Sequence, residues 1–145
     1  MSQQKIINNI LADKWHQGVV IKGKGRGKKL GFPTLNLKPL KPFKPLKPFK
    51  PLNFKPGVYS CQVKIDNQIC QGLFHYGPRP TFKEKKPVLE IHVLNFNKQI
   101  KTGTEIKFKL LKYLRKTKRF KNEQELIIQI KNDIMKTRQY FKGEK

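Results

Sequence analysis

The sequence predicts a mostly β domain: a small antiparallel barrel or sandwich of about six strands, with one C-terminal helix packed outside. Three observations predict it. Much of the chain is divided into short segments in which apolar and polar side chains alternate. Asp66-Asn67 separates two such segments at the spacing of a two-residue β-hairpin. A capped amphipathic helix follows at 122–141, and the length of 145 residues favours a single domain, 1–145.

Residues 1–16 are predicted to form a helical lead-in to the first strand. Their apolar side chains recur at the spacing of an amphipathic helix: Ile6, Ile7, Ile10 and Leu11. The pattern then changes to alternation. Val19 and Ile21 would lie on one side of a strand, opposite to Val20.

A glycine-rich basic stretch follows and has the composition of a phosphate-binding loop. Glycines let backbone N–H groups approach an anion closely, and cations neutralise its charge. The residues concerned are Gly23, Lys24, Gly25, Arg26, Gly27, Lys28 and, slightly later, Gly31. The spacing matches neither GxGxxG nor GxxxxGKS/T, and we expect no helix after it, so a flexible basic hairpin loop is the alternative.

Thr34 and Asn36 end this stretch with two small oxygen-bearing side chains. If the backbone is extended here, both point to the same face, because strand side chains repeat every two residues. A hydroxyl and an amide oxygen are ligands that Mg²⁺ accepts when phosphates supply the negative charge. These residues favour a site for a nucleotide polyphosphate and its metal.

Residues 38–56 contain a period-three repeat of Lys-Pro followed by Leu or Phe. Proline at every third position excludes a sheet ladder and a helix interior. We interpret the segment as a low-complexity surface insertion. Alternatively, a polyproline II helix would align its Leu and Phe side chains into a stripe that binds a partner.

The centre of the chain predicts a hairpin and then a loop. Residues 57–65 and 68–76 alternate on either side of the predicted turn. Residues 77–82 carry two prolines, which fix φ and indicate a rigid loop. Residues 83–87 would form a charged tip.

The next predicted strand, 88–96, carries two titratable side chains on one face. Glu90 lies among apolar residues on a strand that has the composition of one buried on both sides, which should raise its pKa. The alternative is a surface glutamate paired with a lysine. His92 is either a ligand or an ordinary histidine at the rim of the core.

The last strand is predicted at 105–111, and a basic loop at 113–121 joins it to the helix. Its inward residues would be Ile106, Phe108 and Leu110. Asn122 and Glu125 have the spacing of a capping box, and the helix should end near Phe141. Its apolar stripe would be Leu126, Ile127, Ile130 and Ile134.

The chain is strongly basic, with 33 Lys and Arg against 9 Asp and Glu and a net charge of +24. This charge raises nucleic acid as a partner, but the lysines are scattered, and a lysine-rich composition explains the count equally well. No apolar run approaches the ~20 residues that cross a bilayer, and no signal peptide is evident. We therefore expect a cytoplasmic protein in which Cys61 and Cys70 are small apolar residues rather than a disulfide.

Several motifs in a fixed order resemble a known family. They are LGFPTLN at 30–36, PGVY at 56–59, GPRPTF at 77–82, LEIH at 89–92, and Leu114-Arg115 with Phe120 before a helix carrying Gln129, Ile130 and Asp133. In this order they resemble riboflavin kinase (flavokinase), in the form found as the C-terminal domain of bacterial bifunctional riboflavin kinase/FAD synthetase. The resemblance covers about residues 10–141.

The resemblance implies a six-stranded antiparallel Greek-key barrel (riboflavin-kinase-like) with the C-terminal helix outside. It implies an ATP:riboflavin 5′-phosphotransferase that forms FMN and ADP with Mg²⁺. The implied site residues are Glu90 as catalytic base; Thr34 and Asn36 for Mg²⁺ and the nucleotide phosphates; the loop of residues 23–31 over ATP; and Leu114, Arg115 and Phe120 for the flavin. The enzyme would be a cytoplasmic monomer with small-molecule substrates, no membrane association and no nucleic acid partner.

The sequence departs from the family's usual pattern at His75-Tyr76, at Asn95 and at residues 101–103, which bears on the flavin pocket. The HxGH-type motif of the adenylyltransferase half is absent, so FAD synthesis is not expected on this chain. The alternative function is a basic nucleic-acid-binding β-barrel module without catalysis.

Overall fold

The computed structural model describes residues 14–23, 25–39, 55–79, 84–96 and 98–143. The predicted helical lead-in lies outside these residues except at its end, where Trp15 and His16 already belong to a strand, so the predicted boundary is wrong there. Most of the Lys-Pro repeat and all of Lys24 also lie outside the described residues.

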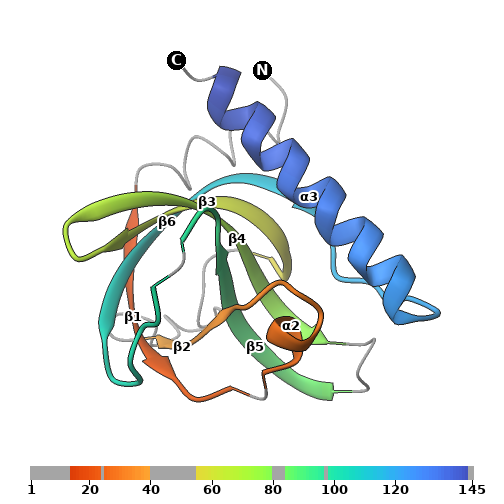
Figure 1. Cartoon of the computed structure of the whole chain (residues 1–145), viewed down its shortest axis with the longest axis horizontal. Helices are drawn as coiled ribbons and strands as arrows, with labels where there is room; N and C mark the ends of the chain where they lie inside the picture. Colours follow the sequence, from red (N-terminus) through yellow and green to blue (C-terminus); the bar gives the residue numbers. More distant parts are fainter. Residues whose placement is uncertain (1–13, 24, 40–54, 80–83, 97, 144–145) are drawn as a thin grey trace.

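The described residues form β1 (Trp15–Ile21), α2 (Arg26–Lys29), β2 (Leu35–Pro39), β3 (Gly57–Ile65), β4 (Gln68–Arg79), β5 (Glu84–Val93), β6 (Glu105–Arg115) and α3 (Glu123–Gly143). The strands close into an antiparallel barrel in the order β1-β2-β5-β4-β3-β6 (Figure 1). Strands β3, β4 and β5 follow one another, and β6 returns to pair with β3, which is a Greek key. The predicted fold class is confirmed.

The β3–β4 hairpin has the turn that its sequence predicts. Asp66 and Asn67 adopt positive φ angles of 50° and 64°. Two left-handed residues define a type I′ turn, whose twist matches that of the flanking strands.

The core fills the inside of the barrel with one face of each strand. Buried residues there include Val20, Leu37, Tyr59, Cys61, Val63, Phe74, Leu89, Ile91, Ile106, Phe108 and Leu110. Phe74 stacks on Phe108 at 5.3 Å between ring centroids. The three inward residues predicted for β6 are confirmed. Burial raises the pKa of the Cys61 thiol, and both Cys61 and Cys70 are free.

The strands around the predicted proline loop are longer than expected. β4 continues to Arg79 and pairs with the start of β5 at Glu84, so the predicted loop and charged tip are partly strand. A register shift between Gly77 and Arg79 explains why the ladder tolerates Pro78, since proline is accepted at such irregularities. β5 ends at Val93, because Asn95 turns the chain with a φ of 54°.

Two register shifts in the β3–β6 pair decide where the end of β6 points. At the first shift, Cys61 pairs with Leu110 and Ser60 with Lys112, so Leu111 is an extra residue of β6. At the second shift, Tyr59 pairs with Tyr113 and Val58 with Arg115, so Leu114 is another extra residue. Each extra residue reverses the face of the residues after it. The second shift therefore places Arg115 on the outer face, after the inward-facing Tyr113, and residues 113–115 are strand rather than the predicted loop.

Helix α3 packs across the outside of the barrel (Figure 1). Asn122 caps it, since its Oδ1 accepts a hydrogen bond from the Glu125 N–H at 2.9 Å. The helix runs to Gly143 rather than ending near Phe141. Its fully buried residues are Asp133 and Thr137, not the predicted isoleucine stripe, and Thr137 shares a hydrogen bond of 2.9 Å with Ser60 on β3.

Candidate active site

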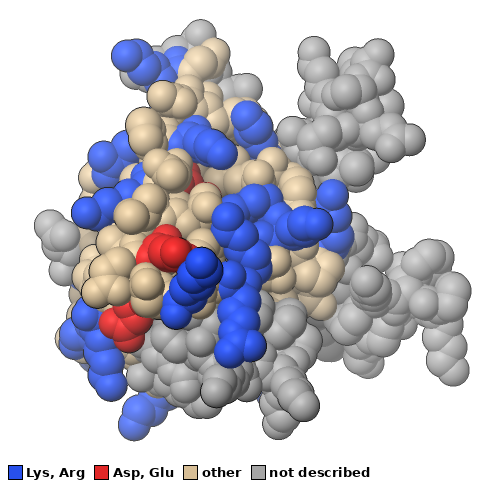
Figure 2. Space-filling view, turned by 90° about the vertical axis from the view of Figure 1, so that its right-hand side faces the viewer, with Lys and Arg blue, Asp and Glu red and all other residues tan. Residues whose placement is uncertain are grey.

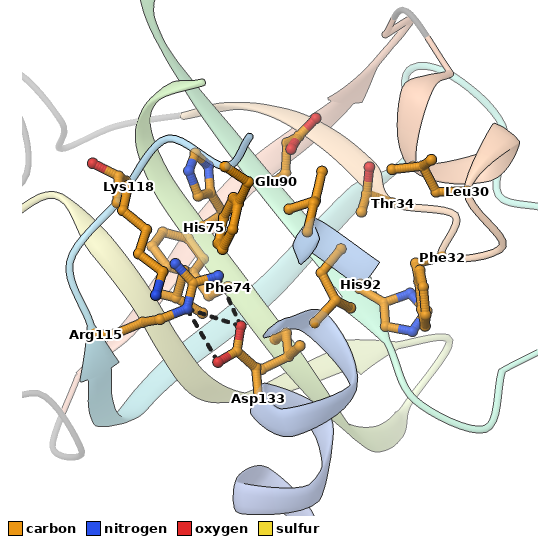
Figure 3. A pocket seen from close by; sticks show the side chains of 17 residues that line it. Leu30, Phe32, Thr34, Phe74, His75, Glu90, His92, Arg115, Lys118 and Asp133 are labelled. Carbon is orange, nitrogen blue, oxygen red and sulfur yellow. Dashed lines mark hydrogen bonds and ion pairs between the residues drawn. The ribbon is translucent and has the colours of Figure 1, made fainter. Parts of the chain in front are cut away.

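A pocket lies between the outer face of the barrel, the segment after β1, the segment after β6, and α3 (Figure 3). Its cavity volume is about 130 Å³. The lining residues are Gly27, Leu30, Phe32 and Thr34; Val58; Leu73, Phe74 and His75; Glu90 and His92; Arg115, Thr117, Lys118 and Phe120; and Leu126, Ile130 and Asp133. The walls are therefore mostly apolar, with a few polar groups, as is usual for a small-molecule site.

One row of register partners crosses the floor of this pocket from β2 to β6. Asn36 pairs with Glu90, Glu90 with His75, His75 with Val58, and Val58 with Arg115. Register partners in neighbouring strands point to the same face of a sheet. The row places one side chain of each strand on the outer face, and it joins the polar end at Asn36 to the end at Arg115.

Glu90 is a buried carboxylate in the middle of this row, with 5% of its surface exposed. Figure 3 shows its side chain on the same side of the pocket as Thr34 and His75. Among the described residues, Glu90 and Asp133 are the buried acidic side chains, and both line the pocket. Because Glu90 is buried, the alternative of a glutamate on the surface is wrong.

Thr34 and Asn36 lie on either side of the start of β2. Thr34 lines the pocket, and Asn36 faces Glu90 across the strand pair. Gly23 lies against the amide of Asn36 so closely that a Cβ at residue 23 would be 1.9 Å from Nδ2. The hydroxyl of Thr34 and the amide oxygen of Asn36, near one carboxylate, suit Mg²⁺ that carries phosphate ligands.

The glycine-rich segment itself contains one helical turn, α2, and no helix follows it among the described residues before β2, as expected. Only glycine fits at residue 27 in this turn, because the Cβ of any other residue would lie 2.4 Å from the Phe32 carbonyl oxygen and clash with it. Gly25 and Gly31 adopt positive φ, and Lys28 is exposed. Among the basic-loop residues whose side chains the structure describes, Gly27 lines the pocket, and Gly23, Gly25, Lys28 and Gly31 shape or flank the segment beside it. The side chain of Arg26 lies outside the described part of the chain.

His92 holds the segment before β2 against β5. Its Nδ1 lies 2.7 Å from the Pro33 carbonyl oxygen, and its ring meets Phe32 edge-on at 5.8 Å. A carbonyl only accepts, so Nδ1 carries the proton and donates. His92 is thus a rim residue with a backbone partner, and it holds Phe32 and Pro33 against β5.

Arg115 and Asp133 form a bidentate ion pair at the other end of the pocket (Figure 3). Nε donates to both carboxylate oxygens at 3.1 and 3.0 Å, and an Nη donates to Oδ2 at 2.8 Å. Gln129, one turn earlier in α3, donates to Oδ1 at 3.0 Å. Phe120 lies beside the guanidinium, 5.8 Å from its carbon to the ring centroid.

The predicted flavin residues are only partly together. Arg115 and Phe120 line the pocket, but Leu114 is the extra residue of the second register shift and is not among the lining residues. Sequence reasoning did not assign His75, Lys118, Leu126 or Ile130 to the site. Asp133 had a visible signal, since it continues the helix face of Leu126 and Ile130 as a carboxylate where an apolar residue is expected.

Within the described residues, no group of three or more His, Cys, Asp or Glu forms a metal cluster. No helix in this part of the chain combines the length and apolar character needed to cross a bilayer.

Comparisons with known proteins identify the family. The sequence model described as Flavokinase: Riboflavin kinase matches residues 13–141. The chain is 31% identical over 128 residues to the bifunctional riboflavin kinase/FMN adenylyltransferase of Bacillus subtilis (strain 168), covering 86% of this chain and 38% of that protein. It is 32% identical over 118 residues to the RNA-binding riboflavin kinase RibR of the same organism, covering 81% of this chain and 46% of RibR.

Two solved structures are similar in fold to this chain. A structure titled as a macrolide-efflux protein from Streptococcus pneumoniae has a TM-score of 0.70 at 28% identity, covering 86% of this chain and 38% of that one. Riboflavin kinase from Trypanosoma brucei has a TM-score of 0.58 at 22% identity, covering 88% and 79%, and supports the fold. The chain spans less than half the length of the two curated relatives described above. Because the family's sequence model spans nearly the whole chain, the protein belongs to the riboflavin kinase family.

Proposed function

We propose that this chain transfers the γ-phosphate of ATP to the 5′-hydroxyl of riboflavin, giving FMN and ADP. The observation that carries the proposal is the buried Glu90 in the pocket, opposite Asn36 across the strand pair. A carboxylate withdrawn from water beside neutral oxygen ligands is the arrangement that phosphoryl transfer to a hydroxyl needs.

Glu90 acts as the general base. Its carboxylate takes the proton of the ribityl hydroxyl while that oxygen bonds to the γ-phosphorus, and the bond from phosphorus to the bridging oxygen breaks, so that ADP leaves. General-base catalysis of this kind contributes ~10² to 10⁴ in rate. The partial exclusion of water by Leu30, Phe32 and Leu73 favours transfer to the hydroxyl over hydrolysis.

Thr34 and Asn36 hold the nucleotide end. Their oxygens would bind Mg²⁺ together with the ATP phosphates, and a bound Mg²⁺ supplies charge neutralisation to those phosphates. Two neutral protein ligands bind this cation weakly alone, so metal and ATP should bind together. The segment of residues 23–31 would cover the nucleotide.

The flavin would occupy the end of the pocket that α3 closes. Leu126 and Ile130 offer an apolar wall, and Phe120 and Arg115 offer a ring and a planar cation. Aromatic ligands pack well against such a set. Leu114 would act only by supporting the strand that presents Arg115.

The comparisons limit how much is proposed. The chain covers 38% of the bifunctional relative, and adenylyltransferase activity belongs to that protein's name, so we propose the kinase step alone for this chain. We further propose that the protein acts as a monomer in the cytoplasm, with riboflavin and ATP as its small-molecule substrates.

The test is direct. Purified protein incubated with riboflavin, ATP and Mg²⁺ should yield FMN and ADP in equal amounts, resolved by chromatography. Riboflavin fluorescence should be quenched on binding, most strongly with Mg²⁺ and nucleotide present. Absence of FMN under saturating substrates would overturn the proposal.

A second candidate, RNA binding alongside catalysis, has one structural observation in its favour. The outer faces of β1, β6 and β3 align Lys107 and Lys109 with Trp15 and Lys64 through the strand register. Lys109 lies 5.5 Å from the exposed Trp15 ring. Lysines beside an aromatic ring can contact phosphates while the ring stacks on a base. RibR is named RNA-binding, and Figure 2 shows that basic side chains also cover another side of the molecule.

A further inference from the structure

We propose that Asp133 is a positioning residue for the flavin: its carboxylate, carried by α3, fixes the guanidinium plane of Arg115 in the pocket and thereby sets the affinity for riboflavin. This inference rests on the proposed kinase function and deepens it. It assigns to α3 a part in substrate binding, besides covering the barrel.

The geometry of the pair fixes an orientation. Three hydrogen bonds of 2.8 to 3.1 Å join Nε and one Nη of Arg115 to the two oxygens of Asp133. The other Nη donates to the Lys116 carbonyl oxygen at 3.3 Å. A planar group held along its edge at several points cannot rotate, so its flat faces are directed by Asp133.

The carboxylate is itself fixed. Asp133 is 1% exposed, and the Gln129 amide donates to Oδ1 at 3.0 Å from the preceding turn of the same helix. Gln129, Asp133 and Arg115 therefore form one hydrogen-bonded network from α3 to the pocket. Phe120 lies beside Arg115, so the segment after β6 contacts the same network.

Stability alone does not explain a charge at this position. Leu126, Ile130, Asp133 and Thr137 follow helical spacing on the face of α3 that packs against the barrel. Replacing a buried ion pair with apolar residues is often neutral or stabilising, because removing two charges from water is costly. In a chain with 9 acidic residues and a net charge of +24, burying one of them at the pocket points to a requirement for geometry.

The backbone is arranged for the same contact. Without the second register shift, regular alternation would place Arg115 on the same face as Tyr113, toward the inside of the barrel. The register shift turns it to the outer face, where Asp133 and the pocket lie. Two independent features, a strand irregularity and a buried helix carboxylate, converge on one guanidinium.

The experiment compares Asp133→Asn with Thr137→Val in the full chain. Both variants remove a buried polar contact between α3 and the barrel, but Thr137 does not line the pocket. Asp133→Asn should raise KM for riboflavin about tenfold or more, the loss expected when a charge-assisted hydrogen bond is removed. KM for Mg·ATP should stay within about twofold, and Thr137→Val should leave both values near wild type.

Two further measurements separate positioning from folding. Arg115→Lys combined with Asp133→Asn should raise KM for riboflavin no more than the larger single change, because both act through one guanidinium. Gln129→Leu, which leaves the ion pair in place, should raise KM by a smaller factor, about twofold to threefold. It supplies the answer if Asp133→Asn does not fold.

Several results would overturn the inference: an unchanged KM for riboflavin in folded Asp133→Asn, an unchanged KM in Gln129→Leu where Asp133→Asn cannot be folded, an equal rise in Thr137→Val, or additive effects in the double variant. Riboflavin affinity is also measured by fluorescence quenching without turnover. Wild-type protein that binds riboflavin but forms no FMN would refute the kinase function and leave the Asp133 measurement intact.

Discussion

Asn36 on β2 and Glu90 on β5 are direct register partners, so an amide and a buried carboxylate that are far apart in the sequence share one face of the barrel. The pairing depends on barrel closure, because β2 meets β5 rather than its neighbour along the chain, β3. It brings Asn36, which we propose binds the nucleotide phosphates and Mg²⁺, next to Glu90, which we propose accepts the proton of the hydroxyl.

Glu90→Gln should lower kcat at least ~10²-fold, since the amide keeps the shape of the side chain but cannot accept the hydroxyl proton. Steady-state FMN formation measures this, with KM for both substrates followed in parallel. Glu105→Gln is the matched control, because Glu105 is an exposed carboxylate at the start of β6. Normal turnover in Glu90→Gln would remove Glu90 from the chemistry.

Gly23→Ala should behave like Asn36→Ala. A Cβ at residue 23 would be 1.9 Å from the Asn36 amide and would displace that side chain. Both changes should raise KM for Mg·ATP about tenfold, the loss of one or two polar contacts, with little effect on KM for riboflavin. Gly143→Ala, whose Cβ meets nothing within 4 Å, is the control. Wild-type KM in Gly23→Ala would show that the position of Asn36 does not matter for nucleotide binding.

We expect His92 to support nucleotide binding through its Nδ1–H hydrogen bond rather than through its ring contact. His92→Asn keeps an N–H at the position of Nδ1 and can still bond the Pro33 carbonyl, whereas His92→Phe keeps only the ring contact with Phe32. We expect His92→Phe to raise KM for Mg·ATP by about threefold to tenfold and His92→Asn to stay near wild type. The reverse order would assign the role to the ring.

His16 should make stability depend on pH. Burial, helped by the charge of Lys14, lowers the pKa of His16 from 6.5 to about 4. The unfolded chain then binds a proton that the folded barrel does not, so stability is fully present above pH 6.5 and falls as the pH drops toward 4. The loss is about 3 kcal/mol at ~1.4 kcal/mol per pH unit. Urea unfolding at several pH values measures it.

His16→Phe is the reference for that slope, because it retains a ring that can stack on Phe108 as His16 does at 5.3 Å. Between pH 6.5 and 4, the free energy of unfolding of the variant should lack the decrease that His16 causes in the wild type, while other titrating groups contribute equally in both proteins. Equal dependence of the free energy of unfolding on pH in the two proteins would place the His16 ring in contact with solvent.

RNA binding, if present, should depend on the lysine face of the barrel. Replacing Lys64, Lys107 and Lys109 with alanine should reduce the salt slope for a single-stranded oligonucleotide by about two, at ~0.7 per phosphate. Kinase activity should be unchanged, because these residues do not line the pocket. Exposed lysines at 98, 101 and 131 provide a variant of equal net charge. Equal losses in both variants would indicate binding by overall charge alone.

The sequence predicted the parts of the fold that local chemistry determines. Alternation located the strands, Asp66-Asn67 predicted the hairpin, and Asn122 predicted the start of α3, because each depends on neighbouring residues. Strand ends were less predictable. Pro78 suggested a loop, but a register irregularity accommodates it within the β4–β5 ladder.

The site was predictable in its residue types but not in its full membership. Thr34, Asn36 and Glu90 were assigned to one site by resemblance, and the barrel brings them together. Leu114 was assigned to the flavin by resemblance, and it does not line the pocket; it is the extra residue of a register shift, which alternation cannot foresee. Asp133 was visible as a carboxylate on an apolar helix face, but its partner depends on tertiary packing across the chain.

The row from Asn36 to Arg115 takes one residue from each of five strands, so no single hairpin contains the chemistry. A refolding chain should therefore regain the proposed phosphotransferase activity in one step, when the last pair of these five strands forms. Grafting the whole row onto another scaffold would require all five of these strands to be transferred together.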